Sequence, residues 1–202
     1  MPMYVLRVWL PDRPGALGAV ASRIGGVKAD VIGIEIIDRG AGRAVDELTV
    51  DLPQAELLDL LVAEVGQVEG VAVEDVRPLG APHEDLAVTA LAVAAGVATA
   101  PSDETMATSM VEGARRLLHA DWAALVRLDP DVLVAGVGDG LPNAAWVCGF
   151  VRGAGTGDVG AGVEELAVAT VPGRGWVLVV SRDHLPLRGR ERALLSGLGA
   201  LG

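Results

Sequence analysis

The sequence predicts an α+β protein made of two domains that differ in fold. In the first 79 residues the apolar pattern follows the order strand, helix, strand, strand, helix, strand, whereas the second half opens with helices and repeats no part of this order. A Pro-Leu-Gly-Ala-Pro segment at 78–82 can continue neither a helix nor a strand, so we place the boundary there. We therefore expect one domain over 1–79, a linker with a connecting helix over 80–101, and a second domain over 102–202.

The first domain begins with a strand over residues 4–10, where two sets of side chains alternate with a period of two. After Pro14 the spacing changes to that of a helix, because residues 17, 20, 21 and 24 are apolar and fall on one stripe. The glycines at 25 and 26 end this helix.

Two more strands follow at residues 31–37 and 44–52, joined by a loop that carries glycines at 40 and 42. A second apolar stripe over 57–65 predicts another helix, and residues 71–76 form a final strand. The order is βαββαβ, a ferredoxin-like arrangement of two split βαβ units whose helices cover one face of the sheet.

The second domain combines helices with strands suited to an antiparallel sheet. One helix starts near residue 84, and another over 103–119 has Ser102 as its cap. Strands are expected over 122–128, 132–137, 163–169 and 176–181, and a helix over 190–201 closes the chain. The apolar stretch 144–151 fits either type of element.

The loop between the first strand and helix reads Leu-Pro-Asp-Arg-Pro-Gly-Ala-Leu over residues 10–17. We expect Asp12 to accept hydrogen bonds from amides at the helix start, and Pro14 to suit the first helical position. Gly15 allows a backbone or a ligand to approach closely. The amides of Gly15, Ala16 and Leu17 then form a weak anion site that suits a carboxylate.

With this Asp-x-Pro-Gly-x-Leu motif in a βαββαβ order, residues 3–78 resemble the ACT domain family. The resemblance implies that a small ligand, usually an amino acid, binds at this loop, often across a dimer interface and with help from a residue just before the second strand. It assigns ligand binding to Asp12, Arg13, Pro14, Gly15, Ala16, Leu17, Asp30 and Val31. Asp30 stands where the family often has asparagine, and a carboxylate there could pair with a ligand ammonium.

Simpler interpretations stay open at both positions. The Asp-x-Pro-Gly turn could serve only to start a helix, and Asp30 could be a turn residue at the entrance of a strand.

The strand over 31–37 is apolar and lies at an edge of the predicted sheet, which favours pairing with another chain. We expect a homodimer that forms through this edge.

Residues 102–201 resemble a GAF-like domain through two segments, a helix-then-hairpin opening over 120–131 and a closing helix over 186–195. The resemblance assigns no site residue.

Residues 155–160 match Gly-x-Gly-x-x-Gly, but a dinucleotide-binding fingerprint needs a helix after it, and here the pattern of a strand follows. We interpret this segment as a flexible glycine loop.

The composition argues against several classes of partner. The net charge is -11 and the chain has one lysine, which disfavours nucleic acid and acidic membrane surfaces. The start of the chain lacks the pattern of a signal peptide, so we expect a cytoplasmic protein. The single Cys148 is interpreted as a buried hydrophobe, and the arginines at 182, 188, 190 and 192 as a solvated helix start.

Catalytic patterns are absent from the sequence. The three histidines lack the spacing of metal ligands, and no serine lies in a Gly-x-Ser-x-Gly motif. We therefore expect no catalytic residue, no metal and no cofactor. The sequence predicts a regulatory protein that binds a small metabolite, an amino acid, at the first loop. The alternative is a scaffold that assembles with an enzyme or transporter through its sheet edge, and an unrecognised enzyme comes third.

Overall fold

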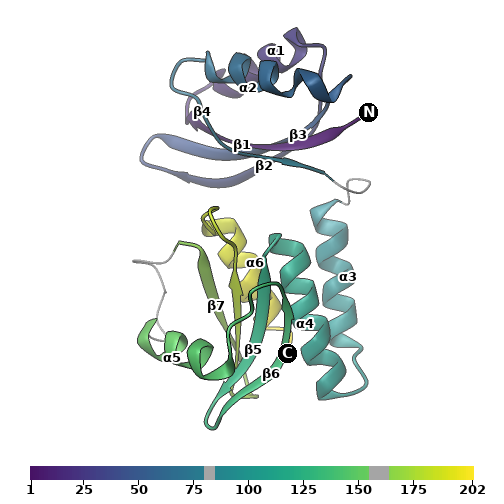
Figure 1. Ribbon diagram of the computed structural model, residues 1–202, viewed down its shortest axis with the longest axis vertical. Coiled ribbons are helices and arrows are strands. Elements are labelled where there is room, and N and C mark those ends of the chain that lie inside the picture. Colours follow the sequence, from purple (N-terminus) through teal and green to yellow (C-terminus); the bar gives the residue numbers. More distant parts are fainter. Residues whose placement is uncertain (80–84, 155–163) are drawn as a thin grey trace. The chain divides into compact units, whose positions relative to one another are not determined.

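A computed structural model describes residues 1–79, 85–154 and 164–202 and divides the chain into two units between residues 83 and 84. Each unit is built on a four-stranded antiparallel sheet, which confirms the expected α+β fold class (Figure 1). Helix α3 (Leu86–Ala98) lies within the second unit, so most of the segment 80–101, which was expected to be a linker with a connecting helix, is part of that unit. The glycine-rich segment 155–160 lies outside the described residues.

The first unit has the predicted βαββαβ order, and its sheet has the strand order β2-β3-β1-β4. Both long helices pack on one face of this sheet (Figure 1). The elements are β1 (Met3–Pro11), α1 (Ala16–Gly26), β2 (Asp30–Gly40), β3 (Arg43–Asp51), the short 3₁₀ helix η1 (Ala55–Leu57), α2 (Leu58–Gly66) and β4 (Ala72–Pro78). Strand β2 is therefore an edge strand, as expected.

The core of the first unit joins alternate residues of the strands to one stripe of each helix. Leu6 and Val8 of β1 are fully buried, and so are Val20 and Ile24 of α1. A strand buries every second residue, and a helix buries every third or fourth residue. The packing of these two sets of side chains fixes the end of β1 relative to the start of α1, and so positions the loop between them.

The other face of β1 carries an ion pair that is buried. Glu47 of β3 accepts hydrogen bonds from Arg7 Nε and Arg77 Nη2, both at 2.9 Å. Burial raises the pKa of Glu47, but the charges of Arg77 and Arg7 outweigh this effect, so the pKa lies below its ordinary value. The ionised carboxylate therefore stabilises the folded state at neutral pH.

The pH dependence of the Glu47→Gln variant tests this assignment. We expect the variant to unfold more easily than the wild type at neutral pH, because it removes the negative charge that Arg7 and Arg77 share at Glu47. As the pH falls below 4.5, the ordinary glutamate value, the unfolded chain takes up a proton first and the advantage of the wild type should shrink. Urea unfolding across this pH range measures the difference, and a gap that stays constant would contradict the lowered pKa.

The second unit has a sheet of order β6-β5-β8-β7. The apolar stretch 144–151, which fitted either type of element, lies in the helix α5 (Ala144–Ala154). The remaining elements are α4 (Asp103–Leu118), β5 (Trp122–Leu128), β6 (Asp131–Gly138), α5 (Ala144–Ala154), β7 (Leu166–Val171), β8 (Trp176–Ser181) and α6 (Gly189–Gly199). Glu164 and Glu165 precede β7, which corrects their expected place inside a strand. Ser102 caps α4 through a 3.2 Å bond from the Thr105 amide, as expected.

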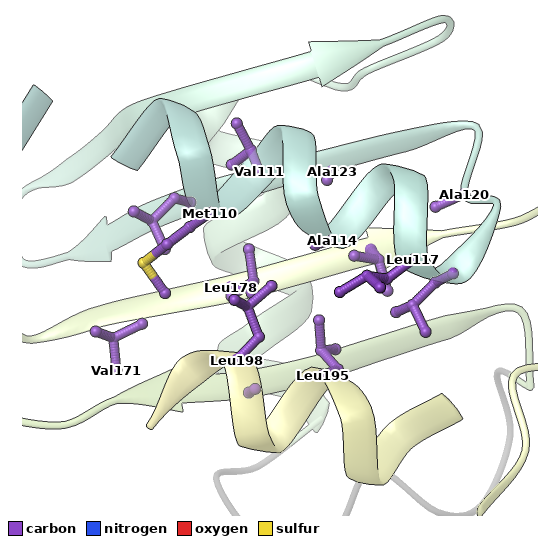
Figure 2. Close-up of a cluster of buried hydrophobic side chains, with 14 of the residues drawn as sticks. Met110, Val111, Ala114, Leu117, Ala120, Ala123, Val171, Leu178, Leu195 and Leu198 are labelled. Atoms are coloured by element: carbon purple, nitrogen blue, oxygen red, sulfur yellow. The ribbon is translucent and has the colours of Figure 1, made fainter. Parts of the chain in front are cut away.

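Helices cover both faces of this second sheet. Met110, Ala114 and Leu117 of α4 and Leu195 of α6 gather around Leu178 of β8 on one face (Figure 2). The opposite face packs against α5 and buries Cys148, as expected. Such alternate burial on both faces explains why β8 reads as an uninterrupted apolar strand.

Arg182 is buried, which corrects its expected place in a solvated helix start. Its Nη1 lies 2.7 Å from Glu191 Oε1 of α6 and 2.9 Å from the carbonyl oxygen of Leu118, and its Nε donates to Leu185 at 3.1 Å. A fourth bond of 2.8 Å joins Nη2 to the Pro186 carbonyl. The side chain thus ties the end of β8 to α4 and α6.

Helices α3 and α4 approach closely at Gly113. A Cβ at this position would lie 2.3 Å from Val93 Cγ1 of α3. We expect Gly113→Ala to destabilise the protein by about 1–2 kcal/mol, because overpacking outweighs the gain in helix propensity. The control is Gly149→Ala in α5, where a Cβ meets nothing within 4 Å and the change should be neutral or stabilising. Denaturant unfolding compares the two, and equal stability would contradict the close contact.

Candidate functional site

The loop between β1 and α1 is held by its own backbone. The Asp12 amide donates to the Gly42 carbonyl at 2.9 Å, which fastens the loop to the turn between β2 and β3. The Arg13 amide donates to Pro11 at 2.8 Å, and the Ala16 amide donates to Arg13 at 3.3 Å. The loop is therefore a defined turn at one end of the sheet.

Gly15 is the N-cap of α1 and has the left-handed backbone conformation, with φ 86° and ψ -14°. A Cβ here would meet nothing within 4 Å. The expected close approach of another part of the backbone was therefore wrong, whereas the approach of a ligand stays a prediction, and the glycine is needed for its positive φ. That conformation turns the chain from the loop into the first turn of the helix.

Two other expectations about this loop were wrong. No side chain caps α1, and Asp12 Oδ1 lies instead 4.0 Å from Arg39 Nε of β2. Pro14 does not occupy the first helical position, because the helix begins at Ala16. The bond from the Ala16 amide to Arg13 creates a separate turn that sets Pro14 and Asp12 apart from the helix.

The free amides at the helix start also differ from the prediction. The Ala16 amide is used within the turn, and the first helical bond runs from the Ala19 amide to the Gly15 carbonyl at 3.0 Å. The amides of Leu17 and Gly18 have no acceptor among the described residues. Together with the helix dipole, they give this end of α1 a partial positive charge.

A cavity of about 460 Å³ opens beside this loop. Four of the predicted site residues line it, namely Arg13, Pro14, Gly15 and Ala16, and the rest of the lining comes from Ala19, Arg23, Gln67, Val68 and Glu69. Arg13 faces Glu69 at 4.0 Å, and Arg23 pairs with Glu64 at 2.8 Å. Helical spacing from Ala16 through 19 to 23 could have identified Arg23 from the sequence, but no local pattern marks the end of α2 as its neighbour.

Asp30 and Val31 lie at the other end of the same sheet. Asp30 is opposite Asp51, which also faces Met3 at the start of β1. The loop follows Pro11, which pairs with Arg43 at the far end of β3. At about 3.4 Å per residue the two parts of the predicted site lie roughly 27 Å apart within one chain. The structure therefore does not bring them together.

Asp46 is a residue that sequence reasoning missed. It is only 3% exposed, and its Oδ1 has no hydrogen-bond partner among the described residues. Burial raises its pKa, the positive charge of Arg39 opposes this effect, and the negative charge of Asp12 adds to it. The signal was available, because Asp46 interrupts the alternating apolar positions 44, 48 and 50 of β3.

The second unit has a cavity of about 800 Å³ between α3, α4, the residues that follow α4 and Val137 of β6. Its polar lining includes Ser109, Arg115, Arg116 and His119.

Among the residues that the structure describes, no cluster of three His, Cys, Asp or Glu side chains could hold a metal ion. In the same part of the chain no helix has the length and apolar character needed to cross a bilayer.

No family model and no curated protein matches the chain. Similar solved structures include the ACT domain of a GTP pyrophosphokinase from Chlorobium tepidum, at 18% identity and a TM-score of 0.32, which covers 39% of this chain and 100% of that one. The chromophore-binding domain of phytochrome P1 from Stigmatella aurantiaca has 12% identity and a TM-score of 0.37, over 98% and 91% of the two chains. An unknown protein from Galdieria sulphuraria has 12% identity and a TM-score of 0.35, over 89% and 79%.

The role of Gly15 can be tested by stability. We expect Gly15→Ala to lower the free energy of unfolding by about 1–2 kcal/mol, because a left-handed conformation is costly for alanine. Gly18→Ala is the matched control in the same helix, since a Cβ there meets nothing and alanine favours a helix. Urea unfolding of both variants checks the prediction, which fails if Gly15→Ala is as stable as the control.

Proposed function

We propose that the first unit is a regulatory module that binds a small metabolite, an amino acid, and that the protein is not a catalyst. The observation that carries this proposal is the cavity at the start of α1, lined by four residues of the loop. The unbonded amides of Leu17 and Gly18 and the guanidinium group of Arg13 favour a carboxylate nearby. The Asp-x-Pro-Gly-x-Leu resemblance to ACT domains supports the same ligand class.

We further propose that the module acts as a homodimer through β2. This edge strand exposes three isoleucines, Ile32, Ile34 and Ile36, by 44%, 48% and 40%. Apolar side chains on an open edge favour pairing with a second chain. Antiparallel pairing of two β2 strands would bury them and would place the loop of one subunit near Asp30 of the partner subunit, so that the two separated parts of the site meet.

A thermal-shift screen with the proteinogenic L-amino acids tests ligand binding. A ligand present at 100 times its dissociation constant should stabilise the folded state by about 2.7 kcal/mol, which raises the melting temperature by several degrees. A flat response across the panel would contradict the proposed function. It would favour instead a scaffold that uses the same edge to assemble with another protein.

A charge placed on the edge strand tests the dimer. We expect Ile34→Lys to convert the dimer to a monomer in light scattering and to weaken amino-acid binding, because two lysines would face each other across the interface. Leu60→Lys is the matched control, since Leu60 is also 48% exposed but lies on α2. A wild type that is monomeric at micromolar concentration, or a Leu60 variant that dissociates equally, would contradict the proposed interface.

A further inference from the structure

Helix α3 presents an exposed apolar face in the second unit. None of its 13 residues is charged, and its one polar residue, Thr89, is buried. Val88 and Leu91 are nevertheless 63% and 71% exposed, more than any of the three isoleucines on the β2 edge. A helix that is apolar on all sides is normally covered, so this face is expected to have a partner.

The exposed side chains of α3 lie beside an open hollow. The cavity of about 800 Å³ lies between α3 and α4, and Ala92 and Gly96 line it from the α3 side. A Cβ added at Gly96 would meet nothing within 4 Å, so this part of the cavity is open. A ridge and a hollow on the same face suit a two-fold contact between identical chains, because the ridge of each copy can enter the hollow of the other.

The α4 wall of this cavity has charges that the chain does not pair. Glu112 and Arg116 both line the cavity, one helical turn apart, and neither side chain forms an ion pair or hydrogen bond among the described residues. Gly113, which packs closely against Val93, lies between them and sets them beside the middle of α3. When two copies pair antiparallel across α3, Glu112 of each copy comes opposite Arg116 of the other.

Charge and size set the strength of such a contact. The net charge of -11 opposes the association of two copies, but equal numbers of acidic residues and arginines line this cavity, namely Glu112, Asp121, Arg115 and Arg116. Helices α3 and α4 have 13 and 16 residues. Their common face is therefore about 20 Å in each direction, smaller than the roughly 800 Å² per partner that a standard interface buries. We expect a contact that is weaker than pairing through the β2 edge.

We propose that the α3–α4 face, which is the exposed side of α3 with the adjoining cavity wall of α4, binds a second copy of the chain in an antiparallel two-fold contact. Leu91 of each copy then lies near the two-fold axis, beside the hollow that Ala92 and Gly96 leave in the other copy. The contact is distinct from the β2 edge and does not depend on a ligand of the first unit. A chain with both surfaces forms dimers through one of them and larger assemblies when both are used.

Sedimentation velocity from micromolar to millimolar concentration tests the contact, with every change made in the Ile34→Lys variant so that β2 cannot pair. We expect this variant to be a monomer at micromolar concentration and to form a dimer as the concentration rises. Leu91→Lys should abolish the dimer, because two lysines would meet near the axis. Leu201→Lys is the matched control, since Leu201 lies in the same unit after α6 and is 45% exposed. The control should dimerise as its parent does.

A charge reversal tests whether the occupant is a second copy. Glu112→Arg alone and Arg116→Glu alone should each weaken the dimer by about tenfold or more, because like charges then face each other. The double variant, with both changes in one chain, should regain the dimer, because opposite charges face each other again. A partner of any other kind would keep its own charges, so the double change would not restore its binding.

Three results would overturn the proposal. The first is an Ile34→Lys protein that stays monomeric up to millimolar concentration. The second is a Leu91→Lys variant that melts well below Leu201→Lys, since Leu91 would then be covered by another part of its own chain. The third is a double variant that dimerises no better than the single ones. Amino-acid binding by the first unit is measured separately in the thermal-shift screen, so each proposal can fail without the other.

Discussion

The burial of apolar sheet faces beneath helices is the constraint on which both units depend. In the second unit, α4 and α6 cover one face of the sheet and α5 covers the other. In the first unit, α1 and α2 cover a single face of a sheet that is four strands wide. Their cover ends before the edge strand, and Ile34 and Ile36 stay exposed although their neighbours Leu48 and Asp46 are buried. The edge through which the dimer is proposed to form lies at this margin.

The same arrangement separates the two parts of the predicted site. Strands β1 and β2 both pair antiparallel with β3, so they run in the same direction, and α1 carries the chain back between them. The loop after β1 and the entrance to β2 must then lie at opposite ends of the sheet. A ligand that touches both Gly15 and Asp30 would therefore need a second subunit, whose antiparallel approach reverses the order of the two ends.

The sequence predicted the elements well because strand and helix periods are local properties. The βαββαβ order and the cap at Ser102 needed no tertiary information. The details of the loop were harder to predict, since the bond from the Ala16 amide to Arg13 decides where the helix begins. The cavity also depends on how the end of α2 packs beside α1, which neither helix encodes alone. The edge position of β2 followed from topology, but the separation of Asp30 from the loop required the register of the sheet.

The structure distinguishes two buried charged residues, Arg182 and Asp46, that look alike in the sequence. Arg182 and Asp46 are 5% and 3% exposed, and both interrupt apolar surroundings. Arg182 has a carboxylate partner in Glu191 and the carbonyl oxygens of Leu118, Leu185 and Pro186, so its charge is compensated within the unit. Such a group holds elements together, and its removal would leave partners unpaired. Asp46 has no such partners, so its burial costs stability that packing does not return.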